Sequence, residues 1–166
     1  MDLQSLLEAV KAWPISTAIR EDGMWFPLIE CTHVLAVTSV VGSIAVVDLR
    51  LLGVSSLNRA VTKLTDELLP YTWSAFVLAA ITGGLLFMSK APDYVKNGFF
   101  LAKMLLLVAA FFNMLIFHLV TFKGVARWDE SPRTPAAARA AGLSSICLWI
   151  VIVACGRWIG FTMSPF

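Results

Sequence analysis

The sequence predicts an all-α fold, an antiparallel four-helix transmembrane bundle with two short amphipathic surface helices. Hydrophobic residues make up 58% of the chain and charged residues 14%, and the mean hydropathy is +0.79. A soluble domain has roughly a quarter of its residues charged. Four apolar stretches are each long enough to cross a bilayer. Because lipid cannot satisfy an exposed backbone, such stretches must be helices. One membrane domain over residues 1–166 is therefore expected, with spans at about 26–47, 71–89, 98–122 and 143–161.

The first span carries an ionisable pair. Residues 26–47 are almost all apolar, and at ~1.5 Å of rise per residue they reach roughly 33 Å. Trp25 suits the membrane interface, and Pro27 suits the first turn of a helix. Glu30 and His33 interrupt the apolar run, and their spacing of three places them on one helix face. Ionisable residues inside a span usually mark a functional site.

Two shorter segments have the pattern of surface helices. Residues 2–13 repeat apolar side chains at helical spacing, and Pro14 is expected to end this helix. Residues 56–69 show a second apolar face after a serine that can cap a helix, and Pro70 is expected to end it. Both helices are predicted to lie along the membrane surface.

The later spans add further polar residues and two adjacent glycines. Gly83 and Gly84 in the second span permit close contact between helices. A short polar loop, 90–97, and a longer loop, 123–141, join the remaining spans. The polar residues inside the third and fourth spans are Lys103, Asn113, His118 and Arg157.

The distribution of basic residues predicts the orientation. Four spans place both termini on one side, together with four basic residues, whereas seven lie on the side of the two longer loops. The positive-inside rule makes the loop side cytoplasmic. We therefore expect a protein of the bacterial inner membrane, with its termini on the periplasmic or extracellular side.

Four ionisable residues are predicted to share one layer of the membrane. Counting from the span ends at 1.5 Å per residue places Glu30 about 6 Å deep, His33 about 11 Å deep and Lys103 about 8 Å deep. Arg157 falls at a similar depth. Since a charge facing lipid is costly, all four are expected to point into the bundle.

This layer favours a haem site over other arrangements. Two histidines in a four-helix bundle suggest a bis-histidine haem b. His118, however, lies at about 23 Å on the same scale, roughly 12 Å from His33, so we interpret it as a capping or packing residue near Asp48 and Arg50. His33 with Lys103 is a better ligand pair, provided that the lysine is a neutral amine. Arg157 can pair with a propionate, and Glu30 completes the predicted site.

Several runs also carry a family resemblance. The runs IECTHVLAVTSVVGSIAVVDLRLLG and NGFFLAKMLLLVAAFFNMLIFH, with the closing GRWIGF, resemble a family of uncharacterised small bacterial membrane proteins with four spans. A histidine in an early span and a lysine at the head of a later one is more distantly similar to the HemJ-type protoporphyrinogen oxidase, which implies haem b bound by a histidine and a lysine. The matching positions are His33 and Lys103. The chain also distantly resembles CopD-type copper-resistance proteins.

Three functions remain open at this stage. The first is a haem-b protein in electron transfer or an oxidase-like reaction, with lipid around it and an electron-transfer partner or a second copy beside it. The second is transport or metal handling, with copper as the candidate metal, through the Glu30–His33 pair. The third is a structural subunit in which Glu30 and Lys103 form a buried ion pair. No nucleotide-binding, hydrolase or zinc-protease motif occurs, the catalytic residues stay unknown, and no nucleic-acid partner is indicated.

Overall fold

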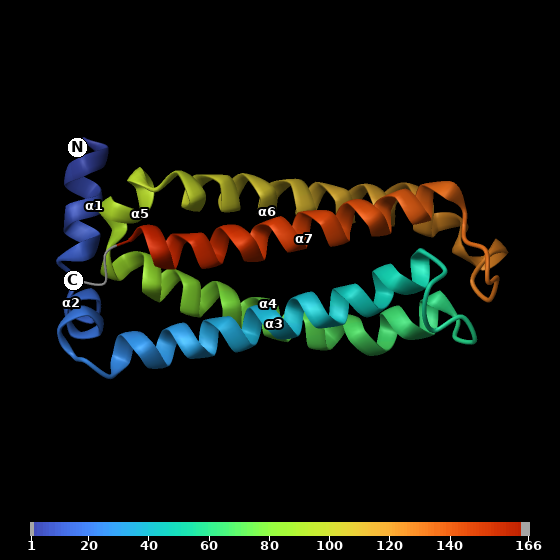
Figure 1. Ribbon diagram of the computed structural model, residues 1–166, viewed down its shortest axis with the longest axis horizontal. Coiled ribbons are helices and arrows are strands. Elements are labelled where there is room, and N and C mark those ends of the chain that lie inside the picture. Colours follow the sequence, from blue (N-terminus) through green and yellow to red (C-terminus); the bar gives the residue numbers. More distant parts are fainter. Residues whose placement is uncertain (1, 164–166) are drawn as a thin grey trace.

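The computed structural model describes residues 2–163 and is built on four long helices. These are α3 (Trp25–Leu51), α4 (Val61–Ser89), α6 (Gly98–Ile116) and α7 (Ala136–Thr162). They run antiparallel along the molecule, so successive helices alternate in direction (Figure 1). Each is long and apolar enough to cross a membrane, the third together with the helical turns that continue α6 to Arg127. The predicted four-helix transmembrane bundle is therefore confirmed.

Three short helices gather at one end of the bundle, which we call the terminal end. They are α1 (Leu3–Lys11), α2 (Pro14–Glu21) and α5 (Ala91–Lys96). Figure 1 shows α1 and α2 lying across the bundle axis at this end, where α7 also finishes. The opposite end, which we call the loop end, contains the connections 52–60 and 128–135.

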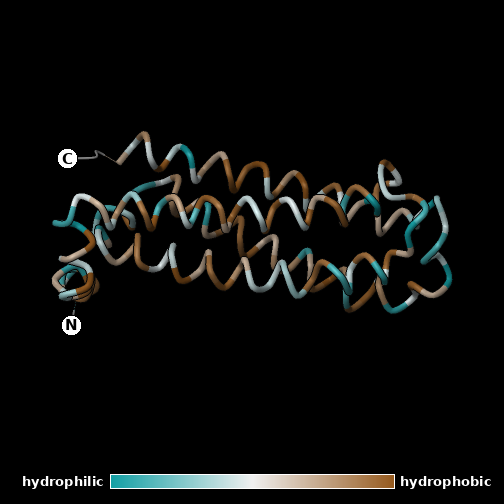
Figure 2. The backbone as a smooth tube through the Cα atoms, turned by 90° about the horizontal axis from the view of Figure 1, so that it is seen from below, coloured by the Kyte–Doolittle hydropathy of each residue, from teal (hydrophilic) through white to brown (hydrophobic). Residues whose placement is uncertain are grey.

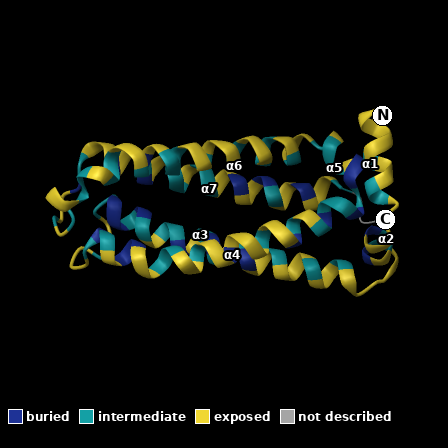
Figure 3. Cartoon of the chain, turned by 180° about the vertical axis from the view of Figure 1, so that it is seen from behind, coloured by how far each residue is buried: buried dark blue, intermediate teal, exposed yellow. Residues whose placement is uncertain are grey.

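The outward surfaces of the long helices are apolar and exposed. Leu35 keeps 69% of its surface exposed, Leu105 72% and Ile150 62%. Figure 3 shows exposed residues along the outer faces of the bundle, and Figure 2 shows apolar residues throughout its length, with hydrophilic ones gathered at its ends. Lipid is the medium in which such a surface is stable, because it removes the apolar area from water.

The four helices are arranged as two hairpins. Helix α3 packs along α4, and α6 packs along α7, while contact between the hairpins runs mainly through α3 and α7. Figure 1 shows the α6–α7 hairpin above the α3–α4 hairpin. Helices α4 and α6 thus flank a less tightly packed side of the bundle.

The prediction of a second surface helix at residues 56–69 is wrong. Residues 61–69 form the first turns of α4, which continues through Pro70 to Ser89. The expected break does not occur because the residues before the proline are anchored by burial: Val61 is 0% exposed and Leu64 is 2% exposed. A proline inside a spanning helix is tolerated where neighbouring groups compensate for the lost backbone hydrogen bond.

Several boundaries also differ from the sequence-based expectations. Pro14 begins α2 rather than simply ending the first helix, and α5 replaces an expected loop. The third span continues past α6 as a π-helical turn, η1 (Phe117–Thr121), and a 3-10 helix, η2 (Phe122–Arg127). The long loop is consequently shorter than predicted.

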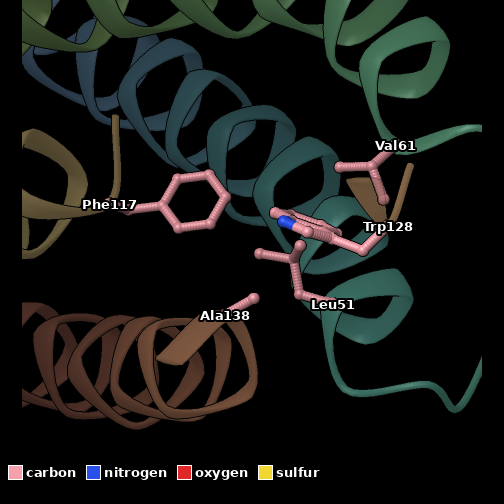
Figure 4. Close-up of a cluster of buried hydrophobic side chains, with 5 residues drawn as sticks. All are labelled: Leu51, Val61, Phe117, Trp128 and Ala138. Atoms are coloured by element: carbon pink, nitrogen blue, oxygen red, sulfur yellow. The ribbon is translucent and has the colours of Figure 1, made fainter. Parts of the chain in front are cut away.

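A compact apolar cluster closes the loop end. Its buried members are Leu51, Val61, Phe117, Trp128 and Ala138. Figure 4 shows the Trp128 indole lying between the side chains of Leu51 and Val61, with Phe117 and Ala138 approaching from other elements. The cluster thereby joins both hairpins to the second connection.

A buried arginine ties the two connections together. Arg50 is 0% exposed. Its Nε donates to the carbonyl oxygen of Arg59 at 2.9 Å, and its Nη2 donates to those of Asp129 at 3.1 Å and Ser131 at 3.2 Å. The planar guanidinium suits several carbonyls at once. One side chain from the end of α3 therefore fixes both loops.

Asp129 caps the start of α4 from the other hairpin. Its carboxylate accepts from the Thr62 backbone N–H at 2.8 Å and from the Thr62 hydroxyl at 2.6 Å, and its carbonyl accepts from the Val61 N–H at 3.2 Å. Desolvation opposes ionisation, but these hydrogen bonds outweigh it and hold the pKa of Asp129 below its usual value. An N-cap is normally supplied by the residue next to the helix, whereas here it comes from a distant loop.

Candidate functional site in the membrane

His33 lies on α3 and is hydrogen-bonded to α4. Its Nδ1 is 3.0 Å from the carbonyl oxygen of Ala79 and 3.0 Å from the Thr82 hydroxyl. A carbonyl oxygen only accepts, so Nδ1 must carry the hydrogen in this arrangement. In the neutral imidazole, Nε2 then bears the free lone pair. The contacts with α4 thus select one tautomer and orient the ring.

A glycine makes room for this imidazole. A Cβ atom built on Gly83 meets His33 Cε1 at 2.9 Å, closer than real Cβ contacts allow. At Gly84 such an atom meets nothing within 4 Å. Of the two adjacent glycines that the sequence offered, Gly83 therefore permits the close approach of the α3 histidine to α4.

Lys103 lies on α6, in the opposite hairpin. Its side chain is half-buried, and its Nζ lies 3.6 Å from the position that a Cβ would occupy at Gly156 of α7. The charge of Lys103 is close enough to act on the His33 imidazole. The structure accordingly brings together two of the four residues predicted to share a layer, each beside a glycine.

The other two predicted site residues do not point into the bundle. Glu30 and Arg157 are both exposed. The Arg157 guanidinium lies 4.5 Å from the centre of the Phe161 ring, a cation–π contact on the outer face of α7. The expectation that all four charges face inward is wrong for these two, because depth along a helix does not fix rotation about its axis.

Glu30 instead acts on the terminal end. Burial raises the pKa of Tyr94 to about 12, and the nearby negative charge of Glu30 adds to this effect. The Tyr94 ring lies 5.2 Å from Phe100 and 6.0 Å from Phe87, centre to centre. The His33 side chain bonds to α4 rather than to Glu30, so the pair suggested by their spacing is not a hydrogen-bonded unit.

The chemistry available to His33 and Lys103 is that of two nitrogen donors. Within residues 2–163, no group of three or more His, Cys, Asp or Glu side chains is placed to hold a metal ion. A haem iron needs only one or two protein ligands, since the porphyrin supplies the other four.

His118 lies elsewhere, in the π-helical turn. Its Nδ1 is 2.9 Å from the Met114 carbonyl oxygen, and its ring lies 5.4 Å from those of Phe117 and Phe122. It lines a cavity near the loop end together with Asp48. His118 and Asp48 therefore line one cavity, whereas Arg50 is bonded to the loops.

Sequence reasoning missed the importance of the two charged residues at the end of the first span. Asp48 and Arg50 are buried, with 6% and 0% exposure. Among the described residues, the buried side-chain atoms without a hydrogen-bond partner are Asp48 Oδ2 and Arg50 Nη1. In the sequence, the only indication of their burial was that both charges lie within an otherwise apolar helix. Their position near the end of the span indicated the membrane interface instead.

The fold and its apolar exterior define an integral membrane protein built as a four-helix bundle. Residues 19–162 match the model of DUF6644, a family of unknown function, and the chain belongs to that family. No curated protein and no solved structure shows significant similarity to the chain.

Proposed function

We propose that this membrane protein binds haem b and serves in electron transfer or an oxidase-like redox reaction, with His33 and Lys103 as the iron ligands. The observation that supports this most is the state of His33. Its Nδ1–H donates a hydrogen bond to the Ala79 carbonyl oxygen of α4, which leaves the Nε2 lone pair free. Histidine ligands of metals are commonly held in this way, with the second ring nitrogen bonded to a carbonyl or carboxylate.

Lys103 supports the same proposal from the facing hairpin. Its amine lies within the membrane-spanning bundle, beside Gly156 and in the neighbourhood of His33. An apolar environment favours the neutral amine, which is the form that ligates iron. When bound, haem b supplies one-electron chemistry. The chain contributes the orientation of the imidazole and an apolar surrounding that excludes water. Glu30 and Arg157 have no ligand role in this proposal, because both are exposed.

One alternative has support from the same geometry. His33 forms hydrogen bonds to Ala79 and Thr82, so it also clamps α3 to α4. In that case the histidine fixes helix register in a structural subunit, and no cofactor is involved. The two functions differ in what Lys103 does, since it takes no part in the clamp.

The experiment is a reduced-minus-oxidised visible spectrum of the protein purified with added haem. The expected result is sharp b-type bands in the wild type and in His118→Gln, the matched control for a histidine substitution. Lys103→Met should weaken or shift the bands, and His33→Ala should abolish them while the protein remains helical. A folded wild-type protein without bands after haem addition overturns the haem proposal. A stability loss confined to His33→Ala then supports the clamp.

A further inference from the structure

A cavity of about 310 Å³ lies between the two hairpins, towards the loop end. It occupies the side where α4 and α6 flank the bundle, and all four long helices line it. Its walls are mainly apolar and include Leu68, Trp73, Leu107, Phe111 and Trp149. Ligand pockets for small molecules begin at about this size and have this apolar character.

Most polar groups in the cavity wall are satisfied within the protein. The Thr72 hydroxyl donates to Ser43 Oγ at 2.8 Å, and Asn113 donates to the Ala141 carbonyl oxygen at 3.1 Å. These groups hold helices together and need nothing further from a ligand.

Asp48 differs from them. It is 6% exposed, Ser145 lies beside its carboxyl, and its Oδ2 has no hydrogen-bond partner among the described residues. It lines the same cavity. An unpartnered buried carboxyl oxygen costs free energy that a hydrogen-bond donor recovers.

The neighbouring arginine does not supply that donor. Arg50 is two residues further along α3, a spacing that turns it away from Asp48. Its Nε and Nη2 are bonded to carbonyl oxygens of the two loops. The ion pairs formed within residues 2–163 do not include Asp48. The described residues therefore leave the Asp48 carboxyl for a donor that enters the cavity it lines.

We propose that this cavity binds a lipophilic amine, whose ammonium group donates to the Asp48 carboxylate and whose apolar body lies between α4 and α6. An ammonium satisfies both the hydrogen-bonding capacity and the charge of a carboxylate in a membrane, where isolated charges are costly. The apolar walls accept a hydrocarbon chain or ring. This site is separate from the His33–Lys103 pair, since Asp48 lies about 22 Å along α3 from His33 at 1.5 Å per residue.

Tryptophan fluorescence tests the proposal, because Trp73 and Trp149 line the cavity. The probes are an alkylamine brominated at its far end and the matching brominated alcohol, added to the purified protein in detergent micelles. Bromine quenches nearby indoles, and the alcohol measures simple partition. The amine should bind at least about tenfold more tightly than the alcohol, as for a charge-assisted hydrogen bond. Trp73→Phe and Trp149→Phe should each remove part of the quenching.

Two pairs of variants decide between specific recognition and partition. Asp48→Asn should remove the preference for the amine, while Asp66→Asn, an exposed change on α4, should keep it. Ala110→Phe fills the cavity wall without touching the charge and should weaken amine binding, whereas Ala109→Phe, on the exposed face of α6, should not. Equal affinities for amine and alcohol in the wild type overturn the proposal. A preference for the amine that persists in Asp48→Asn also overturns it. If Asp48→Asn does not fold, unchanged amine binding in Ala110→Phe overturns the proposal instead.

Discussion

Replacing Arg50 with methionine should destabilise the protein by about 2–4 kcal/mol. The guanidinium donates three hydrogen bonds to loop carbonyls and is 0% exposed. A hydrogen bond to a charged group contributes ~1.5–3 kcal/mol. The Asp129 carbonyl keeps its bond from Val61, and the other two carbonyls lie in loops where water can reach them, so the low end of that range applies. Relief of the buried, unpartnered Nη1 subtracts from the loss.

The matched control is Arg59→Met, the same substitution at an exposed position. Arg59 forms a surface ion pair with Glu67, and such pairs contribute about 0–1 kcal/mol. Unfolding by sodium dodecyl sulfate from mild detergent, followed by circular dichroism, gives both free-energy changes in one assay. Arg50→Lys should recover little, since a single ammonium cannot reproduce the planar fork. Equal stabilities for Arg50→Met and Arg59→Met would refute the role of Arg50 in holding the loops.

Three further predictions follow from local geometry. Asp129→Asn should lower the free energy of unfolding by about 1 kcal/mol near neutral pH, because it weakens the cap of α4. The folded-state pKa of Asp129 lies below the usual 3.8, so the stabilisation by its carboxylate is present above that pH. The difference from wild type in denaturant unfolding should shrink as the pH falls through the folded-state pKa. One of the two tyrosines, Tyr94, should titrate near pH 12 in ultraviolet absorbance. Glu30→Gln should lower the pKa of Tyr94 only partly, because burial is the larger cause. An unchanged titration in Glu30→Gln would contradict the proximity of Glu30 to Tyr94. Gly83→Ala should destabilise the protein by about 1–3 kcal/mol through a clash with the α3 imidazole, while Gly84→Ala should be neutral in the same thermal melts.

The bundle itself could be predicted because the lipid environment leaves few alternatives. Four apolar stretches in a chain with 14% charged residues must be helices, and short connections make them antiparallel. The helix boundaries at the loop end could not be predicted as well. Pro70 looks like a terminator in the local sequence, but α4 passes through it because Val61 and Leu64 are buried against residues distant in the chain. Tertiary contacts override the local signal there.

The candidate site shows the same division. Counting residues gives depth, and the structure brings His33 and Lys103 within electrostatic reach of each other, although their role as ligands stays a prediction. Counting does not give rotation. A step of three residues turns a helix by about 300°, and the remaining offset of about 60° leaves Glu30 exposed beside a half-buried His33. Arg157 is likewise exposed, because its position along α7 fixes its depth but not the direction in which its side chain leaves the helix axis.

Asp48 and His33 lie in different halves of α3, and each has a polar side-chain atom without a hydrogen-bond partner among the described residues. His33 uses Nδ1 within the protein and has no hydrogen-bond partner for Nε2 among the described residues, and Asp48 has none there for Oδ2. The free atoms have different chemistry, since a lone pair on a neutral nitrogen suits a metal whereas a carboxyl oxygen attracts a donor or a cation. A span of about 22 Å between them exceeds what one small ligand covers. The two proposed sites are therefore independent, and we expect the loss of either ligand to leave binding at the other unchanged.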